Sequence, residues 1–397
     1  MMNKYLSRAE ELFPHMQQLQ QRIHSLGGVG YDVRPSAEVI KAELTDIGLE
    51  PEEICECGIV ATVGGKKPGK TILLRADYDA LPQDEQSGLP YAATNGSCHS
   101  CGHDHHAAML MGVARILKEY EDDLEGTVKL MFQPDEESTT GCKRMINAGV
   151  LEDPHVDASL AIHIEAGSDR DTVGKVIWAQ GVTYSAADQF TITVTGQGGH
   201  GSQPHKTQDP VTAACMAVTA VQHIISMEVP AAERAVLTFG TIHGGTVFNI
   251  IPNEVKLTGT IRTFSNETRG LVNRRLGEIF ESVCSAMRCT AKLEYSPNGV
   301  PPVFNNVELA KEIKPWIEEV CGDNYYTAAE PLSFGSEDYA WIAERVPSVI
   351  MTLGAGVPAD GYIYGAHNPA IRFDPHCMPY GAAVFANCVV NYLKAHK

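Results

Sequence analysis

The chain has 397 residues, of which 44% are hydrophobic and 20% charged, a composition typical of soluble globular proteins. The net charge of −18 argues against nucleic acids and anionic membranes as partners, because like charges repel. A chain of this length seldom folds around one hydrophobic core, so we expect two domains.

The N-terminal segment and the cysteines indicate where the protein works. Residues 1–26 contain no apolar segment followed by a small-residue cleavage site, and we expect an amphipathic helix there instead of a signal peptide. We find no apolar run near the roughly 18 residues that span a bilayer. Eleven scattered cysteines favour a reducing compartment over a disulfide framework. We therefore expect a cytoplasmic protein without a membrane or nucleic-acid partner.

The first half of the chain alternates helical and strand-like segments. Apolar periodicity predicts helices at about 3–25, 36–48, 104–119 and 140–148. Ser36 is expected to cap the second helix and Asp104 the third. Short apolar runs predict buried strands at 58–65, 71–77, 127–133 and 158–164. This alternation predicts an α/β fold whose mixed, mostly parallel sheet is flanked by helices.

The pattern changes near residue 187. Alternating polar and apolar residues predict strands at 189–196, 235–245, 254–264 and 290–296. Helices are expected at about 208–226 and 267–286, which gives the β-α-β-β-α-β order of a ferredoxin-like α+β domain. An apolar strand like those of the first half of the chain is predicted again in 346–356. We predict a main domain formed by 1–186 and 299–397, with 187–298 inserted in it.

The segment SCHSCGHDHHAAMLMG, residues 97–112, has two cysteines and four histidines between Cys98 and His106. A zinc ribbon would need a second C-x-x-C pair, which the sequence lacks. Covalent haem attachment needs a histidine directly after the second cysteine, where Gly102 stands. The segment therefore predicts either part of a catalytic metal site or a thioredoxin-like pair, Cys98 and Cys101.

Other residues of the types that bind metals occur in or after predicted strands. They are Asp77, Asp79, Asp135, Glu136, Glu137, His163 and His367. Each alone has an ordinary explanation, such as a solvated turn or a core histidine. Together they place metal-ligand types at four strand ends of one sheet, where open α/β folds build their sites. Asp77 and Asp79 are expected to orient histidine ligands.

Seven motifs then resemble, in order, those of the aminoacylase and carboxypeptidase family of di-metal amidohydrolases. They are LRADYDALP, CHSCGHDHH, FQPDEES, AIHIEAG, GGHGSQPH, NIIPNEVKLTGTIRTF and AHNPAIRFD. The resemblance is to the branch of hippurate hydrolases and auxin-conjugate (IAA-amino acid) hydrolases. It implies two divalent ions per chain, held by Cys101, His103, Glu137, His163 and His367. Zinc, manganese, cobalt and nickel are candidates, because a thiolate suits late first-row ions and the other ligands accept all four.

The resemblance also implies roles for residues that do not bind metal. Glu136 would be the general base that activates a metal-bound water. The inserted domain would be a lid and dimerisation domain over a metal-binding catalytic domain, and the protein a homodimer or higher homo-oligomer. In the lid, His200 would polarise the scissile carbonyl, and Asn249 and Arg262 would meet the substrate carboxylate.

The implied activity is hydrolysis of the amide bond of N-acyl amino acids, as in hippurate hydrolases. Alternative substrates are N-acetyl-diaminopimelate, N-acetyl-cysteine, aminobenzoyl-glutamate and dipeptides. His105, Asp135 and Cys98 depart from the residues usual in the branch, which leaves substrate and metal preference open. Two other classes also stay open: a non-catalytic metal-binding protein, against which the presence of Glu136 argues, and a thiol-disulfide protein, which chelators would not affect.

Overall fold

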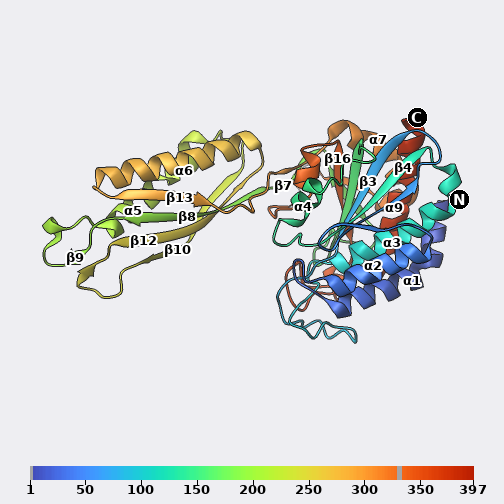
Figure 1. Ribbon diagram of the computed structural model, residues 1–397, viewed down its shortest axis with the longest axis horizontal. Helices are drawn as coiled ribbons and strands as arrows, with labels where there is room; N and C mark the ends of the chain where they lie inside the picture. The colour runs from blue at the N-terminus through green and yellow to red at the C-terminus, as the bar shows by residue number, and fades with distance from the viewer. Residues whose placement is uncertain (1–2, 329–332) are drawn as a thin grey trace. The chain divides into compact units, whose positions relative to one another are not determined.

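The computed structural model describes residues 3–328 and 333–397. Residues 1–2 and 329–332, which fall in the predicted main domain, lie outside the described residues. The chain divides into two compact units (Figure 1). The first comprises Met1–Thr183, Phe304–Leu332 and Asp338–Lys397, and the second comprises Tyr184–Val303 and Ser333–Glu337. Residues 184–186, 299–303 and 333–337, which were predicted in the main domain, belong to the second unit.

An eight-stranded mixed sheet forms the centre of the first unit, in the order β1-β2-β4-β3-β5-β16-β6-β15. The strands are β1 (Glu52–Cys55), β2 (Gly58–Gly64), β3 (Lys70–Asp77), β4 (Gly126–Gln133), β5 (Ala158–Glu165), β6 (Val176–Ala179), β15 (Tyr326–Ala328) and β16 (Ser348–Gly354). The neighbouring strands β4, β3, β5 and β16 run parallel, whereas β1, β2 and β4 pair antiparallel, as do β16 and β6. The predicted α/β sheet is confirmed.

Five helices share one buried core with one face of this sheet. They are α1 (Lys4–Leu26), α2 (Arg34–Asp46), α3 (His103–Glu119), α7 (Val307–Cys321) and α9 (Met378–Ala395). Two short helices, α4 (Gly141–Asn147) and α8 (Ala340–Ala343), pack together outside this core. Helix α3 contacts α1, α9 and strand β3, so every side chain from His103 to Ala114 is buried. The position of α3 therefore fixes the residues at its N-terminus.

Both predicted helix caps are wrong. Helix α2 begins at Arg34 after Val33, and Pro35, whose fixed φ suits a first turn, leaves Ser36 inside the helix and buried. Helix α3 begins at His103, with Gly102 at its N-cap in the left-handed region (φ 85°). The carboxylate of Asp104 instead accepts hydrogen bonds from Gln20 Nε2 at 2.5 Å and His24 Nδ1 at 2.9 Å. Asp104 thus joins α3 to α1.

The second unit is a ferredoxin-like α+β sandwich, as predicted. Its elements are β8 (Ala186–Thr195), α5 (Pro210–Ala220), β10 (Ala235–Gly244), β12 (Glu254–Thr263), α6 (Asn266–Ala286) and β13 (Thr290–Tyr295). The antiparallel sheet has the order β10-β12-β8-β13, and α5 and α6 share its buried core (Figure 1). Two short strands, β9 (Gly199–His200) and β11 (Ile250–Ile251), pair beside it. Strands β7 (Gly181–Tyr184) and β14 (Val303–Asn305) pair where the chain passes between the units.

One segment contradicts the expectation that no stretch has membrane-spanning length. Pro210–Glu228, which contains α5, is long and apolar enough to cross a membrane by length and composition. Its alanines Ala213, Ala214 and Ala217, with Val221 and Ile224, nevertheless lie in the core of the second unit. One side of this segment therefore belongs to that core, although only 33% of the segment is buried.

The buried ion pair of His24 and Asp104 predicts pH-dependent stability. Burial lowers the pKa of His24, but Asp104 and Glu85 outweigh it and raise the pKa to about 10. The pair therefore stabilises the fold fully below about pH 6.5, the pKa of an unfolded-chain histidine, and this contribution disappears as the pH rises through 10.

We expect His24→Gln to lower the free energy of unfolding by about 3 kcal/mol at pH 6, since it removes the positive charge that faces the buried carboxylates of Asp104 and Glu85. Urea unfolding of both proteins at pH 6, 8 and 10 measures the difference. It should shrink with rising pH, and a difference that stays constant from pH 6 to 10 would contradict this role.

Candidate metal centre

Three neighbouring parallel strands end at one edge of the sheet of the first unit. Strand β3 ends at Asp77, β4 at Gln133 and β5 at Glu165. Residues that follow such strands meet at the carboxyl edge, where open α/β folds bind ligands. Helix α3 begins there too, so its N-terminal residues lie beside the side chains from the strands. The predicted metal ligands and Glu136 come together at this edge.

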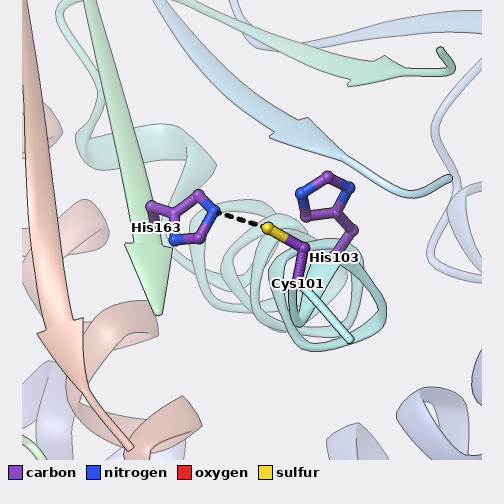
Figure 2. Close-up of side chains that lie close together, drawn as sticks. All are labelled: Cys101, His103 and His163. Atoms are coloured by element: carbon purple, nitrogen blue, oxygen red, sulfur yellow. Dashed lines mark hydrogen bonds between the residues drawn. The ribbon is translucent and has the colours of Figure 1, made fainter. Parts of the chain in front are cut away.

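Cys101, His103 and His163 form the centre of the cluster (Figure 2). Cys101 Sγ lies 3.4 Å from His163 Nε2, and the potential ligand atoms of all three residues lie within 4.8 Å of one another. His163 Nδ1 donates to the backbone oxygen of Ile164 at 2.7 Å. Burial lowers the pKa of His163, but Cys101 outweighs it and raises the pKa to about 9. Once a cation displaces the proton of Nε2, the hydrogen bond to Ile164 keeps the other proton on Nδ1, and the lone pair of Nε2 faces Cys101.

Asp79 gives His103 a similar arrangement. His103 Nδ1 donates to Asp79 Oδ1 at 3.2 Å, and the other oxygen of Asp79 accepts from the backbone N–H of Glu137 at 3.2 Å. His103 Nε2 is buried and has no hydrogen-bond partner among the residues that the structure describes. Asp77 Oδ2 lies 3.8 Å from it, which is too far for a hydrogen bond. A buried imidazole nitrogen without a hydrogen bond is costly unless something binds it. The atom is therefore available to a cation.

His106 differs, because both of its ring nitrogens are engaged. Nδ1 donates to Asp77 Oδ1 at 2.5 Å, and Nε2 accepts from the backbone N–H of Ile164 at 2.9 Å. Burial lowers the pKa of His106 to about 3, so the ring stays neutral. Asp77 also forms an ion pair with Arg75 Nη1 at 2.7 Å. His106 is thus a support for Asp77 and for strand β5, with no lone pair left for a metal.

Glu137 and His367 form a second group with the same cysteine. Glu137 Oε2 lies 3.6 Å from His367 Nε2, and both lie within 4.8 Å of Cys101 Sγ. Glu137 Oε1 is buried and makes no hydrogen bond within 3–328 and 333–397. The backbone N–H of His367 donates to the oxygen of Ser100 at 2.8 Å, which holds the C-terminal loop beside Cys101. Glu136 forms a further group with His103 and Glu137.

The electrostatics of this edge favour bound cations. Burial raises the pKa of the Cys101 thiol, but His103 and His163 outweigh it and lower the pKa to about 6. Burial also raises the pKa of Asp79 and of Glu137, because each carboxylate loses water around its charge. A thiolate and carboxylates in so dry a place require positive charge nearby. The site thus has the donors and the charge of a metal centre.

The remaining predicted site residues lie in the second unit. His200, in β9, is exposed, and its Nδ1 accepts from the backbone N–H of Ser202 at 3.1 Å. Asn249 is exposed beside it, and its backbone oxygen accepts from Gly201 N–H at 2.9 Å. Arg262, in β12, has a buried Nη1 without a hydrogen-bond partner in the described part of the chain. Their roles remain predictions.

Sequence reasoning missed three buried polar residues near the site. Arg75, Gln133 and Asp338 are at most 2% exposed, and they hydrogen-bond to one another. An arginine inside the apolar run TILLRAD was a usable signal, because a buried guanidinium needs a carboxylate partner. Gln133 ends a predicted strand, and Asp338 lies in a segment without a recognised motif, so neither stood out.

The chain is similar to known hydrolases over nearly all of its length. The model of the peptidase family M20/M25/M40 matches residues 73–391. The IAA-amino acid hydrolase ILR1-like 2 of Arabidopsis thaliana is 34% identical over 98% of this chain and 87% of its own. The N-acetyl-L-cysteine deacetylase of Bacillus subtilis is 32% identical over 90% of this chain and 83% of its own. A crystal structure of a dinuclear metal-binding M20 peptidase from Bacillus subtilis matches with a TM-score of 0.82 and 26% identity, covering 97% of this chain and 99% of that one.

Gly102 makes the geometry of the cluster testable. It separates Cys101 from His103 with φ 85°, and a β-carbon there would lie 2.6 Å from two carbons of Ile164. We expect Gly102→Ala to displace Cys101, to lower the metal content and to lower the melting temperature. Metal analysis and calorimetry measure both effects.

The matched control is Gly149→Ala, where φ is 93° but no atom lies within 4 Å of the added carbon. It should lower the free energy of unfolding by only about 1 kcal/mol, the strain of a non-glycine residue at positive φ, and it should keep the metal content. Equal metal content in the two variants would argue against the role of Gly102.

Proposed function

This chain belongs to the peptidase family M20/M25/M40, and we propose that its catalytic centre is the cluster around Cys101, where two divalent ions serve the hydrolysis of N-acyl amino acids. The observation that carries the proposal is that two groups of potential ligands share this cysteine. One contains His103 and His163, and the other contains Glu137 and His367. Two groups with a common thiolate fit a pair of neighbouring ions.

The donor set fits divalent metals. His103 Nε2 and Glu137 Oε1 are buried without hydrogen-bond partners among the described residues, and the pKa of Cys101 favours a thiolate. Thiolate, imidazole and carboxylate together accept zinc, manganese, cobalt or nickel. Three protein donors in each group leave positions for water and substrate. When bound, such a pair lowers the pKa of a water toward neutrality and polarises the amide carbonyl.

Glu136 is the proposed general base. It is 7% exposed and lies within 4.8 Å of the ligand atoms of His103 and Glu137. Its carboxylate takes a proton from the attacking water and delivers it to the amide nitrogen. The second transfer matters as much as the first, because an unprotonated amide nitrogen is a poor leaving group.

The second unit supplies the proposed substrate contacts. We assign His200 to the scissile carbonyl, and Asn249 and Arg262 to the carboxylate of the amino acid. The buried Nη1 of Arg262 supports its assignment, since a guanidinium binds a carboxylate through two parallel hydrogen bonds. In this proposal the unit is a lid and dimerisation domain, and the enzyme works in the cytoplasm as a homodimer or higher homo-oligomer.

The two rival classes are less well supported. A thiol-disulfide protein would need a reactive partner for Cys101, but burial raises the pKa of Cys98 to about 12. The thiol of Cys98 contacts the backbone oxygen of Pro369 at 3.8 Å and stays protonated. A non-catalytic metal-binding protein would not need a carboxylate at Glu136. The site therefore favours an enzyme over both alternatives.

A panel of N-acyl amino acids tests the reaction and the substrate together. The protein, loaded with Zn²⁺, Mn²⁺, Co²⁺ or Ni²⁺ in turn, is assayed for released amine with hippurate, indole-acetyl, N-acetyl and aminobenzoyl conjugates and with dipeptides. The names of the relatives motivate the indole-acetyl and N-acetyl members. We expect amine release that a chelator abolishes, and no release with any conjugate or metal would refute the proposal.

Glu136→Gln separates the base from the ligands. We expect it to keep the fold and both ions but to lower kcat by about 10²–10⁴-fold, because a carboxamide cannot accept the proton. Glu137→Gln is the matched control, and it should lower the metal content. Turnover near that of the wild type in Glu136→Gln would remove Glu136 from this role.

A further inference from the structure

A buried polar network lies behind the cluster, in the first unit. The carboxylate of Asp338, which is fully buried, accepts hydrogen bonds from three partners. Arg75 Nη2 donates to Oδ1 at 3.1 Å, Gln133 Nε2 donates to both oxygens at 2.8 and 2.9 Å, and the backbone N–H of Cys142 donates to Oδ2 at 2.9 Å. Asp338 is thus bound to β3, β4 and α4 at once.

Arg75 connects this network to the histidine side of the cluster. Its Nη1 pairs with Asp77 at 2.7 Å, and its Nε donates to Gln133 Oε1 at 2.9 Å. Asp77 in turn accepts from His106. One guanidinium therefore pairs both with the carboxylate that faces the imidazoles, Asp77, and with the carboxylate of Asp338. Such a buried charge holds its partners in place, because a carboxylate that moves away from it is left in the interior without its counter-charge.

The network ends on the proposed base. The backbone N–H of Asp338 donates to Glu136 Oε1 at 3.4 Å. We propose that Asp338 is a positioning residue for Glu136: its side chain, held by Arg75 and Gln133, fixes the backbone N–H that orients the carboxylate. This inference rests on the proposed function, because it assumes that Glu136 transfers the proton.

The chain around these residues explains why such a support is useful. Glu136 follows β4 after Pro134 and Asp135, and Asp135 has φ 59°, so the strand's hydrogen bonds do not extend to the base. Asp338 follows Ser333–Glu337, which belongs to the second unit, and is the residue at which the chain returns to the first. Because the side chain of Asp338 is anchored in the first unit, a displacement of Ser333–Glu337 need not move the N–H that contacts Glu136.

Asp338→Asn tests the inference. The carboxamide has the shape of the carboxylate, but it lacks the negative charge that pairs with Arg75. Its N–H groups would also face groups that themselves donate hydrogen bonds at this position. We expect kcat to fall about 10- to 100-fold, as for other residues that orient a catalytic group, with KM and metal content unchanged. In a Glu136→Asp background, whose shorter carboxylate does not reach the N–H, the same substitution should have little further effect.

Tyr339→Phe is the matched control. It removes the hydrogen bond from Tyr339 Oη to Ser159 Oγ, 2.7 Å, at the adjacent residue, and it leaves Glu136 untouched. It should keep kcat. If Asp338→Asn does not fold, Gln133→Met, which removes two hydrogen bonds to Asp338, takes its place with the same expected pattern.

Multiplicative effects in the double variant would overturn the inference, and so would a loss of metal that accounts for the loss of kcat. The two proposals fail differently. If the wild type releases no amine, the proposed function is wrong. If the wild type is active and Glu136→Gln is not, but neither Asp338→Asn nor Gln133→Met lowers kcat, only the inference is wrong.

Discussion

The burial of negative charge at one edge of a parallel sheet is the constraint on which the rest of the structure depends. Asp77, Asp79, Glu136 and the thiol of Cys101 are each at most 9% exposed there. Leaving such groups ionised away from water costs several kcal/mol each unless cations or hydrogen bonds compensate them. Arg75 supplies one positive charge, and the ligand groups around Cys101 supply places for more. This edge of the sheet thus has the buried negative charge and the donor atoms of a metal site.

Hydrogen bonds decide what each histidine at this edge can do. His103 and His163 use Nδ1 for an oxygen of the protein and keep Nε2 for a cation, whereas His106 uses both nitrogens. The residue type is the same in all three cases, and the difference comes from partners on or just after β3 and on β5. This is why a dense cluster of histidines in the sequence becomes only part of a site, and why Asp77 and Asp79 matter beyond their charge.

Much of this could be predicted from the sequence, and the rest could not for physical reasons. The spacing of apolar residues predicted the folds of both units, because a helix or strand that buries one face repeats its apolar residues at a regular local spacing. The residues of the cluster follow strands, so their convergence was predictable as well. The caps failed because Pro35 and Gly102, and not the polar side chains, set the helix starts. Asp338 was missed because it lies 205 residues from Gln133, a contact that only the tertiary structure makes.

The central claim, that two ligand groups share one cysteine, is tested most directly by counting metal. The account predicts up to two divalent ions per chain in the wild type and about one in both His163→Ala and His367→Ala, since each removes a ligand from one group. Cys101→Ala should lower occupancy at both positions, because its sulfur belongs to both groups. A Cys101→Ala variant that keeps two tightly bound ions would contradict the account.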